Sequence, residues 1–212
     1  MASRRPGRVE RIKANGHGKR LVDLIFAFTA LVVASPLLAV LGLVVRVSSA
    51  GPALFRQERI GRGMQPFTML KLRTMVDGAD RLVVGLLEES GADQRFYKFN
   101  DDPRITGVGR WLRRWSLDEL PQLWNVVRGD MSLVGPRPGL ASEVEAYESW
   151  QLARLAVRPG LTGAWQVSGR SELSFDDCVR LDLGYIEGWS PRGDLIILAK
   201  TIPAVLGQRG SW

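Results

Sequence analysis

The chain of 212 residues contains a single cysteine, Cys178, and a single histidine, His17. A disulfide within the chain is therefore excluded. The chain also lacks the Cys and His residues needed for a zinc site built from such ligands or for a nucleophile activated by His. Any catalysis must run on carboxylates, Arg and Lys, together with a hard metal ion that prefers oxygen ligands.

Acidic residues are scarce in the first third of the chain. Residues 1–74 hold thirteen Lys and Arg against three Asp and Glu, whereas residues 75–212 hold sixteen against nineteen. Lys and Arg beside a membrane are attracted to its anionic cytoplasmic leaflet by about 1 kcal/mol each. We therefore expect this basic end to contact anionic lipid headgroups, and we expect no nucleic-acid partner. Residues 1–18 are predicted to form a disordered basic arm.

Charge is absent from the 22 residues between Leu24 and Val45. As a straight helix this run would be about 33 Å long, which is enough to cross a bilayer. The Ser35-Pro36 pair divides it, because Pro36 removes a helix hydrogen bond, and each half then reaches only about mid-bilayer. Cations flank the run on both sides, and the positive-inside rule places both flanks in the cytoplasm.

We predict that residues 19–48 form a re-entrant helix-break-helix hairpin, which enters and leaves the membrane by its cytoplasmic face. The Ser35 hydroxyl would then donate to the backbone carbonyl freed by Pro36. A kinked single-pass anchor is the alternative, because proline is tolerated in spanning helices. A cleaved signal peptide fits less well, since the run is too long and no small-residue cleavage site follows it.

Residues 49–212 have the usual size of one domain, and we predict a single cytoplasmic catalytic domain. Two short strands, Ala53–Phe55 and Pro66–Leu72, are expected around a turn at 61–63. Helical spacing predicts helices at Met75–Ser90 and Ser142–Ala156, joined to the rest by loops. Gly107-Val108-Gly109 completes no nucleotide-binding motif and is interpreted as a turn. The predicted fold class is α+β, a mainly helical monotopic membrane protein with a small β-sheet.

Arg110–Trp115 mixes guanidinium and indole groups, which suits an interfacial amphipathic helix in the headgroup region. In the alternative interpretation, Trp111 and Trp115 share a side that faces the core. The sequence does not decide between these two structures.

Two adjacent acids, Asp118 and Glu119, lie at the start of a predicted helix, where the helix dipole favours ionised carboxylates. The alternative is structural, because Ser116 and Glu119 fit a capping box whose side chains only satisfy free backbone N–H groups. The neighbouring loops favour chemistry over capping.

Stiff loops that carry Arg follow these acids. Arg137 lies between two prolines, and the segment that begins at Arg158 leads to Gln166 and Arg170. Fixed guanidinium groups can bind phosphate oxygens bidentately, whereas pairing with surface acids would explain one such loop more easily than two. Two further cations lie near the membrane exit, Lys71 and Arg73. The acids and the rigid Arg residues predict a site for a metal ion and a diphosphate.

Taken together, these motifs resemble the bacterial sugar transferases, also called monotopic phosphoglycosyl transferases. The resemblance runs from Lys19 to Trp212. It rests on ordered blocks: Lys19-Arg20 with Asp23, Ser35-Pro36, residues 71–75 (KLRTM), 102–106 (DPRIT), 116–123 (SLDELPQL), 129–132 (GDMS), 134–138 (VGPRP) and 158–163 (RPGLTG) through 166–170 (QVSGR). It implies a re-entrant helix broken at the Ser-Pro pair.

The resemblance also implies a reaction. Asp118 would attack the sugar-bearing phosphate of a UDP-sugar and expel UMP, and polyprenyl (undecaprenyl) phosphate would then take the phosphosugar from the aspartyl intermediate. Mg²⁺ is the implied cofactor, with Glu119 and Asp118 as its ligands. Phosphate or substrate binding is implied for Lys71, Arg73, Arg137, Arg158, Gln166, Arg170 and Asp182. Asp182 would either assist the metal or orient an Arg.

The expected location is the cytoplasmic face of a bacterial inner membrane, at the first membrane step of a glycan pathway. The QVSGR segment at 166–170 favours glucose or galactose as the sugar. The multi-span N-terminal domain of many larger relatives is absent, and the initial Met favours a minimal enzyme. Candidate partners are a second copy of the chain and downstream glycosyltransferases. The competing functions are a membrane-anchored protein that binds phosphorylated lipid or glycan without turnover, and a surface adaptor for other glycan enzymes.

Overall fold

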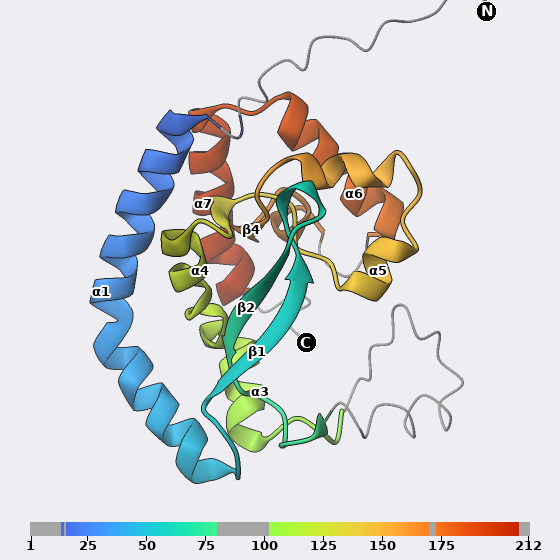
Figure 1. The fold of residues 1–212 in the computed structure, drawn as a ribbon. Coiled ribbons are helices and arrows are strands. Elements are labelled where there is room, and N and C mark those ends of the chain that lie inside the picture. Colours follow the sequence, from blue (N-terminus) through green and yellow to red (C-terminus); the bar gives the residue numbers. More distant parts are fainter. Residues whose placement is uncertain (1–13, 15, 80–101, 170–172, 208–212) are drawn as a thin grey trace, which may run out of the picture.

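The computed structural model describes residues 14, 16–79, 102–169 and 173–207. The predicted basic arm lies almost entirely outside these residues, and so does the predicted connection at 91–100. The described chain combines one long N-terminal helix, several shorter helices and two small sheets (Figure 1). This agrees with the predicted α+β class.

The N-terminal helix α1, His17–Ser48, is a single element of 32 residues that curves along one side of the molecule (Figure 1). The helix continues through Pro36, so the predicted break between two helices is wrong as a statement about secondary structure. The Ser35 hydroxyl donates to the Val32 carbonyl at 2.8 Å. In a regular helix the Val32 carbonyl would accept from the N–H of residue 36, which Pro36 lacks. The predicted bond from Ser35 is therefore confirmed, and it explains why the helix continues through the proline.

Residues after α1 form an antiparallel hairpin. Strand β1, Leu54–Ile60, pairs with β2, Pro66–Leu72, in a register that joins Leu54 to Leu72. The turn contains a short 3₁₀ helix, η2, Arg62–Met64, in which Gly63 adopts φ 66°. The predicted β2 has the observed bounds, whereas β1 runs five residues beyond the predicted strand.

Helix α3, Gly107–Arg114, begins at the glycines that were interpreted as a turn. The Thr106 side chain caps it by accepting a hydrogen bond from the Gly109 N–H at 2.9 Å. A side chain at Gly109 would overlap the Thr74 carbonyl, so this glycine allows the close approach of α3 to the chain after β2. The turn prediction is therefore wrong, and Gly109 is required by packing.

The centre of the chain holds a second sheet that the sequence did not predict. Strand β3, Ser132–Val134, runs parallel to β4, Gly160–Thr162. Between them lie α5, Ala141–Glu145, and the 3₁₀ helix η4, Gln151–Ala156, in place of the single predicted helix. Met75 forms an isolated bridge with Ile105, and most of the helix predicted after it lies outside the described residues.

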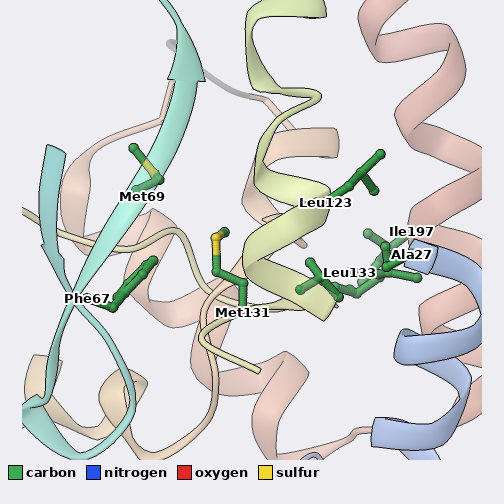
Figure 2. Packing of buried hydrophobic residues seen from close by; sticks show 9 residues of the cluster. Ala27, Phe67, Met69, Leu123, Met131, Leu133 and Ile197 are labelled. Carbon is green, nitrogen blue, oxygen red and sulfur yellow. The ribbon is translucent and has the colours of Figure 1, made fainter. Parts of the chain in front are cut away.

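The main core joins elements from the whole chain. It includes Phe67 and Met69 of β2, Leu123 of helix α4 (Gln122–Arg128), Ala27 of α1 and Ile197 of helix α7 (Pro191–Leu206), and Figure 2 shows these side chains together. Helix α6, Phe175–Glu187, precedes α7. A second cluster packs the far half of α1 onto β2 and α3 through Leu41, Val45, Leu72 and Leu112. Both halves of α1 therefore pack on the same domain.

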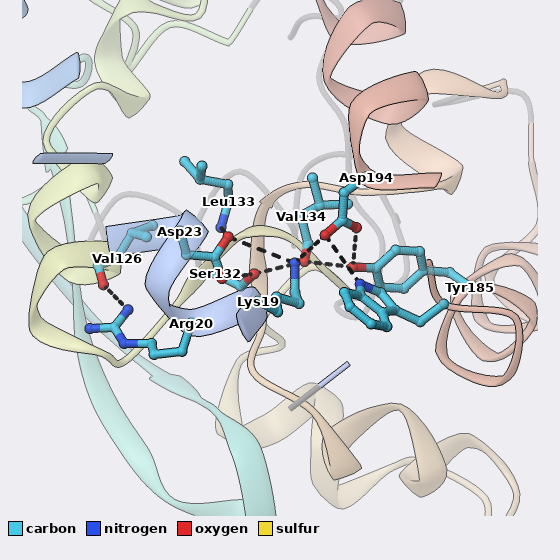
Figure 3. Close-up of polar contacts among 10 residues, drawn as sticks. Lys19, Arg20, Asp23, Val126, Ser132, Leu133, Val134, Tyr185 and Asp194 are labelled. Carbon is cyan, nitrogen blue, oxygen red and sulfur yellow. Dashed lines mark hydrogen bonds and ion pairs between the residues drawn. The ribbon is translucent and has the colours of Figure 1, made fainter. Parts of the chain in front are cut away.

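A buried polar network fastens the beginning of α1 (Figure 3). Lys19 Nζ donates to Asp194 Oδ2 at 2.7 Å, and Asp23 accepts from the Ser132 hydroxyl at 2.7 Å. Arg20 donates to the Val126 carbonyl at 2.6 Å, at the end of α4. These contacts tie α1 to α4, β3 and α7.

Trp111 is 49% exposed, whereas its neighbour Leu112 is fully buried. Leu112 therefore takes the core position in α3, and the alternative in which both tryptophans face the core is wrong for Trp111.

Candidate active site

The acid pair lies in a short 3₁₀ helix, η3, Leu117–Glu119, between α3 and α4. Ser116 adopts the left-handed conformation, with φ 53° and ψ 24°, and its side chain makes no capping bond. The capping-box alternative is therefore wrong. Non-glycine residues rarely adopt this conformation, and such residues concentrate at functional sites. The reversal turns Asp118 inward, where it is 6% exposed.

Asp118 is a buried carboxyl group in a field of mixed charges. Burial raises its pKa above the ordinary value, and the neighbouring Glu119 raises it further, whereas the charges of Lys71 and Arg113 lower it. Arg113 is held in place by a bond from its Nε to the Thr74 hydroxyl at 2.8 Å. A perturbed carboxyl group with cationic neighbours is a candidate for catalysis.

A small, partly open pocket with a volume of about 10 Å³, roughly the space of one water molecule, lies beside Glu119. Its walls come from the hairpin, η3 and α4, the loop after β3, β4 and the 3₁₀ helix η5, Trp165–Val167. Four predicted site residues line it: Lys71, Glu119, Arg137 and Gln166. Two further polar residues in the lining had not been predicted, Arg59 and Gln122.

The pocket holds more positive than negative charge. Lys71 Nζ forms an ion pair with Glu119 Oε1 at 2.8 Å, while Arg59 and Arg137 supply two further cations. Burial and the charge of Arg137 lower the pKa of Arg59 to about 10. Three cations against one lining carboxylate favour an anionic ligand such as a phosphate.

The loop that carries Arg137 is supported from behind. Arg154 donates from Nη2 to the Arg137 carbonyl at 3.3 Å and forms an ion pair with Asp182 Oδ2 at 2.5 Å. Burial raises the pKa of Asp182 to about 6, and Arg154 opposes this shift. Of the two predicted roles for Asp182, the geometry favours orienting an Arg, although that Arg is Arg154.

The two stiff Arg loops pack directly against each other. The Gly160 N–H donates to the Pro136 carbonyl at 2.9 Å, and the Gly135 N–H donates to the Thr162 carbonyl at 2.9 Å. Side chains at Gly135 or Gly160 would collide with the opposite backbone. The glycines are therefore required by backbone packing, which holds Arg137 at the pocket.

Two Arg residues that were predicted to bind phosphate lie away from the pocket lining, as does Asp182. Arg73 donates to the Ser49 and Pro52 carbonyls at 2.7 and 2.6 Å, just after α1. Arg158 Nε donates to the Gly129 carbonyl at 2.9 Å, at the end of α4. Both cations meet carbonyls at or just beyond helix C-termini, where positive charge is favourable. Arg170 lies outside the described residues.

The described part of the chain contains no group of three His, Cys, Asp or Glu side chains that could hold a metal ion. Mg²⁺ at phosphate-transfer sites commonly uses only one or two carboxylates, and substrate phosphates and waters complete its octahedral shell. Asp118 and Glu119 meet that smaller requirement. The residues present therefore fit Mg²⁺ in the company of a bound diphosphate.

The sequence matches the family model described as bacterial sugar transferase over residues 14–208. It is 46% identical over 202 residues to the exopolysaccharide production protein ExoY of Sinorhizobium fredii, covering 93% of this chain and 89% of that protein. It is 43% identical over 196 residues to the UDP-glucose:undecaprenyl-phosphate glucose-1-phosphate transferase of Caulobacter vibrioides, covering 89% and 69%. A third relative is the undecaprenyl-phosphate galactose phosphotransferase of Salmonella typhimurium, 40% identical over 198 residues, covering 92% of this chain and 41% of that protein.

The chain belongs to the bacterial sugar transferase family. The predicted family and enzyme class, a phosphoglycosyl transferase, are confirmed.

Sequence reasoning missed Arg59, Arg113 and Gln122 for identifiable reasons. Arg59 was assigned to the cationic flank of the membrane segment, and Arg113 to a surface in the headgroup region. Gln122 was noticed only as part of the motif that follows the acids. Arg113 could have been identified from the sequence, because it lies five residues before Asp118 and a turn between them can bring the two side chains together.

Proposed function

We propose that this enzyme transfers a sugar 1-phosphate from a UDP-sugar to polyprenyl (undecaprenyl) phosphate, through a phosphosugar bound covalently to Asp118. The observation that carries the proposal is the buried carboxyl group of Asp118 beside a pocket that combines three cations with Glu119. The Caulobacter relative is a transferase that acts on UDP-glucose and undecaprenyl phosphate, and the Salmonella relative is a galactose phosphotransferase that acts on undecaprenyl phosphate, which supports these substrates. They also support glucose or galactose as the sugar.

The first step forms a bond between an Asp118 carboxylate oxygen and the phosphorus that bears the sugar. The bond from that phosphorus to the bridging oxygen breaks, and UMP leaves with the electron pair. In the second step an oxygen of polyprenyl phosphate attacks the same phosphorus, and the Asp118 carboxylate leaves. The products are UMP and a polyprenyl diphosphate sugar, so atoms and electrons balance over the cycle.

The pocket residues counter the charge repulsion of this reaction. An anionic nucleophile approaches an anionic diphosphate, and fixed cations at the phosphate oxygens reduce that barrier. Arg137 is placed to bind the diphosphate, and Lys71 also favours the ionised form of Asp118. Arg59 donates to Gln57 and to the Pro138 carbonyl, so it contributes positive charge from the wall of the pocket. Mg²⁺, held by Glu119 and Asp118 together with substrate phosphates, would supply further charge neutralisation.

The attachment of α1 supports a re-entrant position in the membrane. Among the described residues, α1 is the one helix long and apolar enough to cross a bilayer, and most of its surface is exposed. Its start is tied to α4, β3 and α7, and Arg73 of the chain after β2 binds the residues just beyond its end. These elements share one domain, and we place that domain on one side of the membrane. Both ends of α1 would then lie on that side, the cytoplasmic face.

The exposed apolar residues of α1, including Phe26, Val33 and Val47, would face lipid. Trp111 and the exposed apolar residues of α7, such as Ile202, would lie near the headgroups. In this arrangement a soluble nucleotide sugar and a lipid phosphate would meet the same carboxylate of Asp118 in turn. We place the reaction at the first membrane step of a bacterial glycan pathway.

The test is release of UMP by the purified enzyme with Mg²⁺, undecaprenyl phosphate and either UDP-glucose or UDP-galactose. Asp118→Asn should abolish release without lowering the melting temperature. Glu145→Gln, which alters an exposed carboxylate of α5, is the control and should retain full activity. Full activity in Asp118→Asn would overturn the assignment. Lipid binding by the wild-type enzyme without UMP release across a panel of UDP-sugars would instead favour the binding-protein function.

A further inference from the structure

Gln122 is a buried side chain whose amide nitrogen has no partner. The residue is 3% exposed and begins α4, one helical turn after Glu119. Its Nε2 is buried without a hydrogen bond to any residue that the structure describes. The side chain nevertheless lines the pocket that contains Lys71, Glu119 and Arg137.

A buried donor without an acceptor destabilises a folded protein, because it loses its hydrogen bonds to water and gains none in return. An apolar side chain of similar length, such as Met, would avoid this cost at the same position. The pocket already has apolar lining from Met69 and Leu161, so an apolar residue would be compatible with its surroundings. The amide is therefore better explained by a ligand than by the fold.

The charges around the pocket indicate which ligand atom would accept the bond. Arg59, Lys71 and Arg137 converge on this space, and Glu119 is the one carboxylate in its lining. Such a set holds the most negative part of a nucleotide sugar, which is its diphosphate. A donor one helical turn from Glu119 would meet a phosphoryl oxygen in that position.

We propose that Gln122 is a substrate-binding residue, whose Nε2 donates a hydrogen bond to a phosphoryl oxygen of the nucleotide-sugar diphosphate. This inference rests on the proposed function for the identity of the substrate. When the diphosphate binds, the Gln122 Nε2 gains an acceptor. The free energy lost by the unpartnered donor in the free enzyme then contributes to substrate binding.

The test compares two substitutions of buried glutamines. Gln122→Met removes the unpartnered donor. Gln151→Met is the matched control, because Gln151 is also buried, but its amide is satisfied by Asp176 at 2.8 Å and by the Glu148 N–H at 2.7 Å, outside the pocket. Binding of inorganic pyrophosphate, UDP-glucose and UDP-galactose is measured by calorimetry on the full chain, with Asp118→Asn present in every sample so that the first chemical step cannot occur. Thermal unfolding is measured on the same samples.

Gln122→Met should weaken binding of pyrophosphate and of the nucleotide sugar about tenfold to a hundredfold, the range for a bond to a charged acceptor. Its melting temperature should be unchanged or higher. Gln151→Met should behave in the opposite way, with a lower melting temperature and unchanged binding. This reversal separates a ligand role from a structural role.

Three results would overturn the proposal: unchanged binding of all ligands, weaker binding of nucleotide sugar with unchanged binding of pyrophosphate, or a melting temperature lowered as much as in Gln151→Met. The second result would assign the amide to the sugar or the nucleoside. These binding measurements do not depend on turnover. If the wild-type enzyme released no UMP, the proposed function would be refuted. The binding of pyrophosphate alone would then decide whether Gln122 contacts phosphate.

Discussion

Replacement of Arg154 by Met should damage both the stability and the activity of this enzyme, by separable routes. The Arg154 and Asp182 side chains are 4% and 1% exposed, and their ion pair has an N–O distance of 2.5 Å. The same guanidinium group donates to the Arg137 carbonyl, which connects the pair to the pocket. Breaking a buried ion pair by removing one partner leaves an uncompensated charge inside the protein.

Such a loss typically destabilises by about 3–5 kcal/mol. For a protein of this size each kcal/mol lowers the melting temperature by about 2–4 °C, so Arg154→Met should melt roughly 6–20 °C lower. Loss of the bond to the Arg137 carbonyl, worth about 1 kcal/mol, should reduce kcat/KM for UMP release roughly fivefold at a temperature where the variant stays folded.

The double variant Arg154→Met with Asp182→Leu separates the two effects. A buried ion pair can often be replaced by apolar residues without loss of stability, so most of the lost melting temperature should return. Activity should stay low, because the Arg137 carbonyl still lacks its donor. Thermal unfolding and UMP release on the wild type and the three variants form a complete double-mutant cycle.

The stability lost in Arg154→Met should also depend on pH. Burial raises the pKa of Asp182 to about 6, and the opposing charge of Arg154 is absent from the variant. A carboxyl group with a raised folded-state pKa favours folding in its protonated form, so its contribution is lost as pH rises through that pKa. The variant should therefore be least stable relative to wild type near pH 8 and closer to it near pH 5. A cost below about 1 kcal/mol, or recovery of activity in the double variant, would refute this reasoning.

Two further predictions concern the nucleophile and the membrane. Lys71→Met should move the acidic limb of the pH–kcat profile for UMP release to higher pH, and Glu119→Gln should move it to lower pH. The reason is that Lys71 lowers the pKa of Asp118 whereas Glu119 raises it. Movement of the limb in the same direction in both variants would contradict the assignment of Asp118 as the nucleophile. In a variant without the native cysteine, Glu10→Cys and Ala50→Cys should react with an impermeant thiol reagent in inverted vesicles and resist it in intact cells. Labelling on opposite faces would exclude the re-entrant helix.

The membrane-proximal elements were predictable from the sequence because their signals are local. Alternation of apolar residues identified β2 with its observed bounds, and Pro36 next to Ser35 predicted a bond that is present in α1. The expected break did not occur, because the Ser35 hydroxyl satisfies the Val32 carbonyl within a continuous helix. The strand β1 was underestimated, since its alternating charged residues have the composition of a loop.

The central sheet could not be predicted in the same way. Strands β3 and β4 have three residues each and meet across a long stretch of chain, so neither carries a periodic signal. Their pairing depends on the close backbone approach of Gly135 and Gly160, and a single sequence does not identify the partner of such a glycine.

The candidate site also combines residues that local chemistry could predict with residues whose role depends on the fold. Residue chemistry was enough to select Lys71, Glu119, Arg137 and Gln166, which the fold gathers at one pocket. Chemistry alone could not distinguish a free guanidinium group from Arg73, whose donors the fold uses for carbonyls beyond α1. Whether an Arg binds substrate or backbone depends on which carbonyls the fold places within its reach, as for Arg59 and Arg154, and only the folded structure reveals this.

The most direct test of the central claim is mass spectrometry of the enzyme after incubation with Mg²⁺ and UDP-glucose or UDP-galactose, without a lipid acceptor. The proposed mechanism predicts up to one hexose phosphate per chain, located on Asp118 and released as lipid-linked product when undecaprenyl phosphate is added. An enzyme that turns over with lipid present, but shows neither the adduct nor a stoichiometric burst of UMP without it, would contradict a covalent role for Asp118.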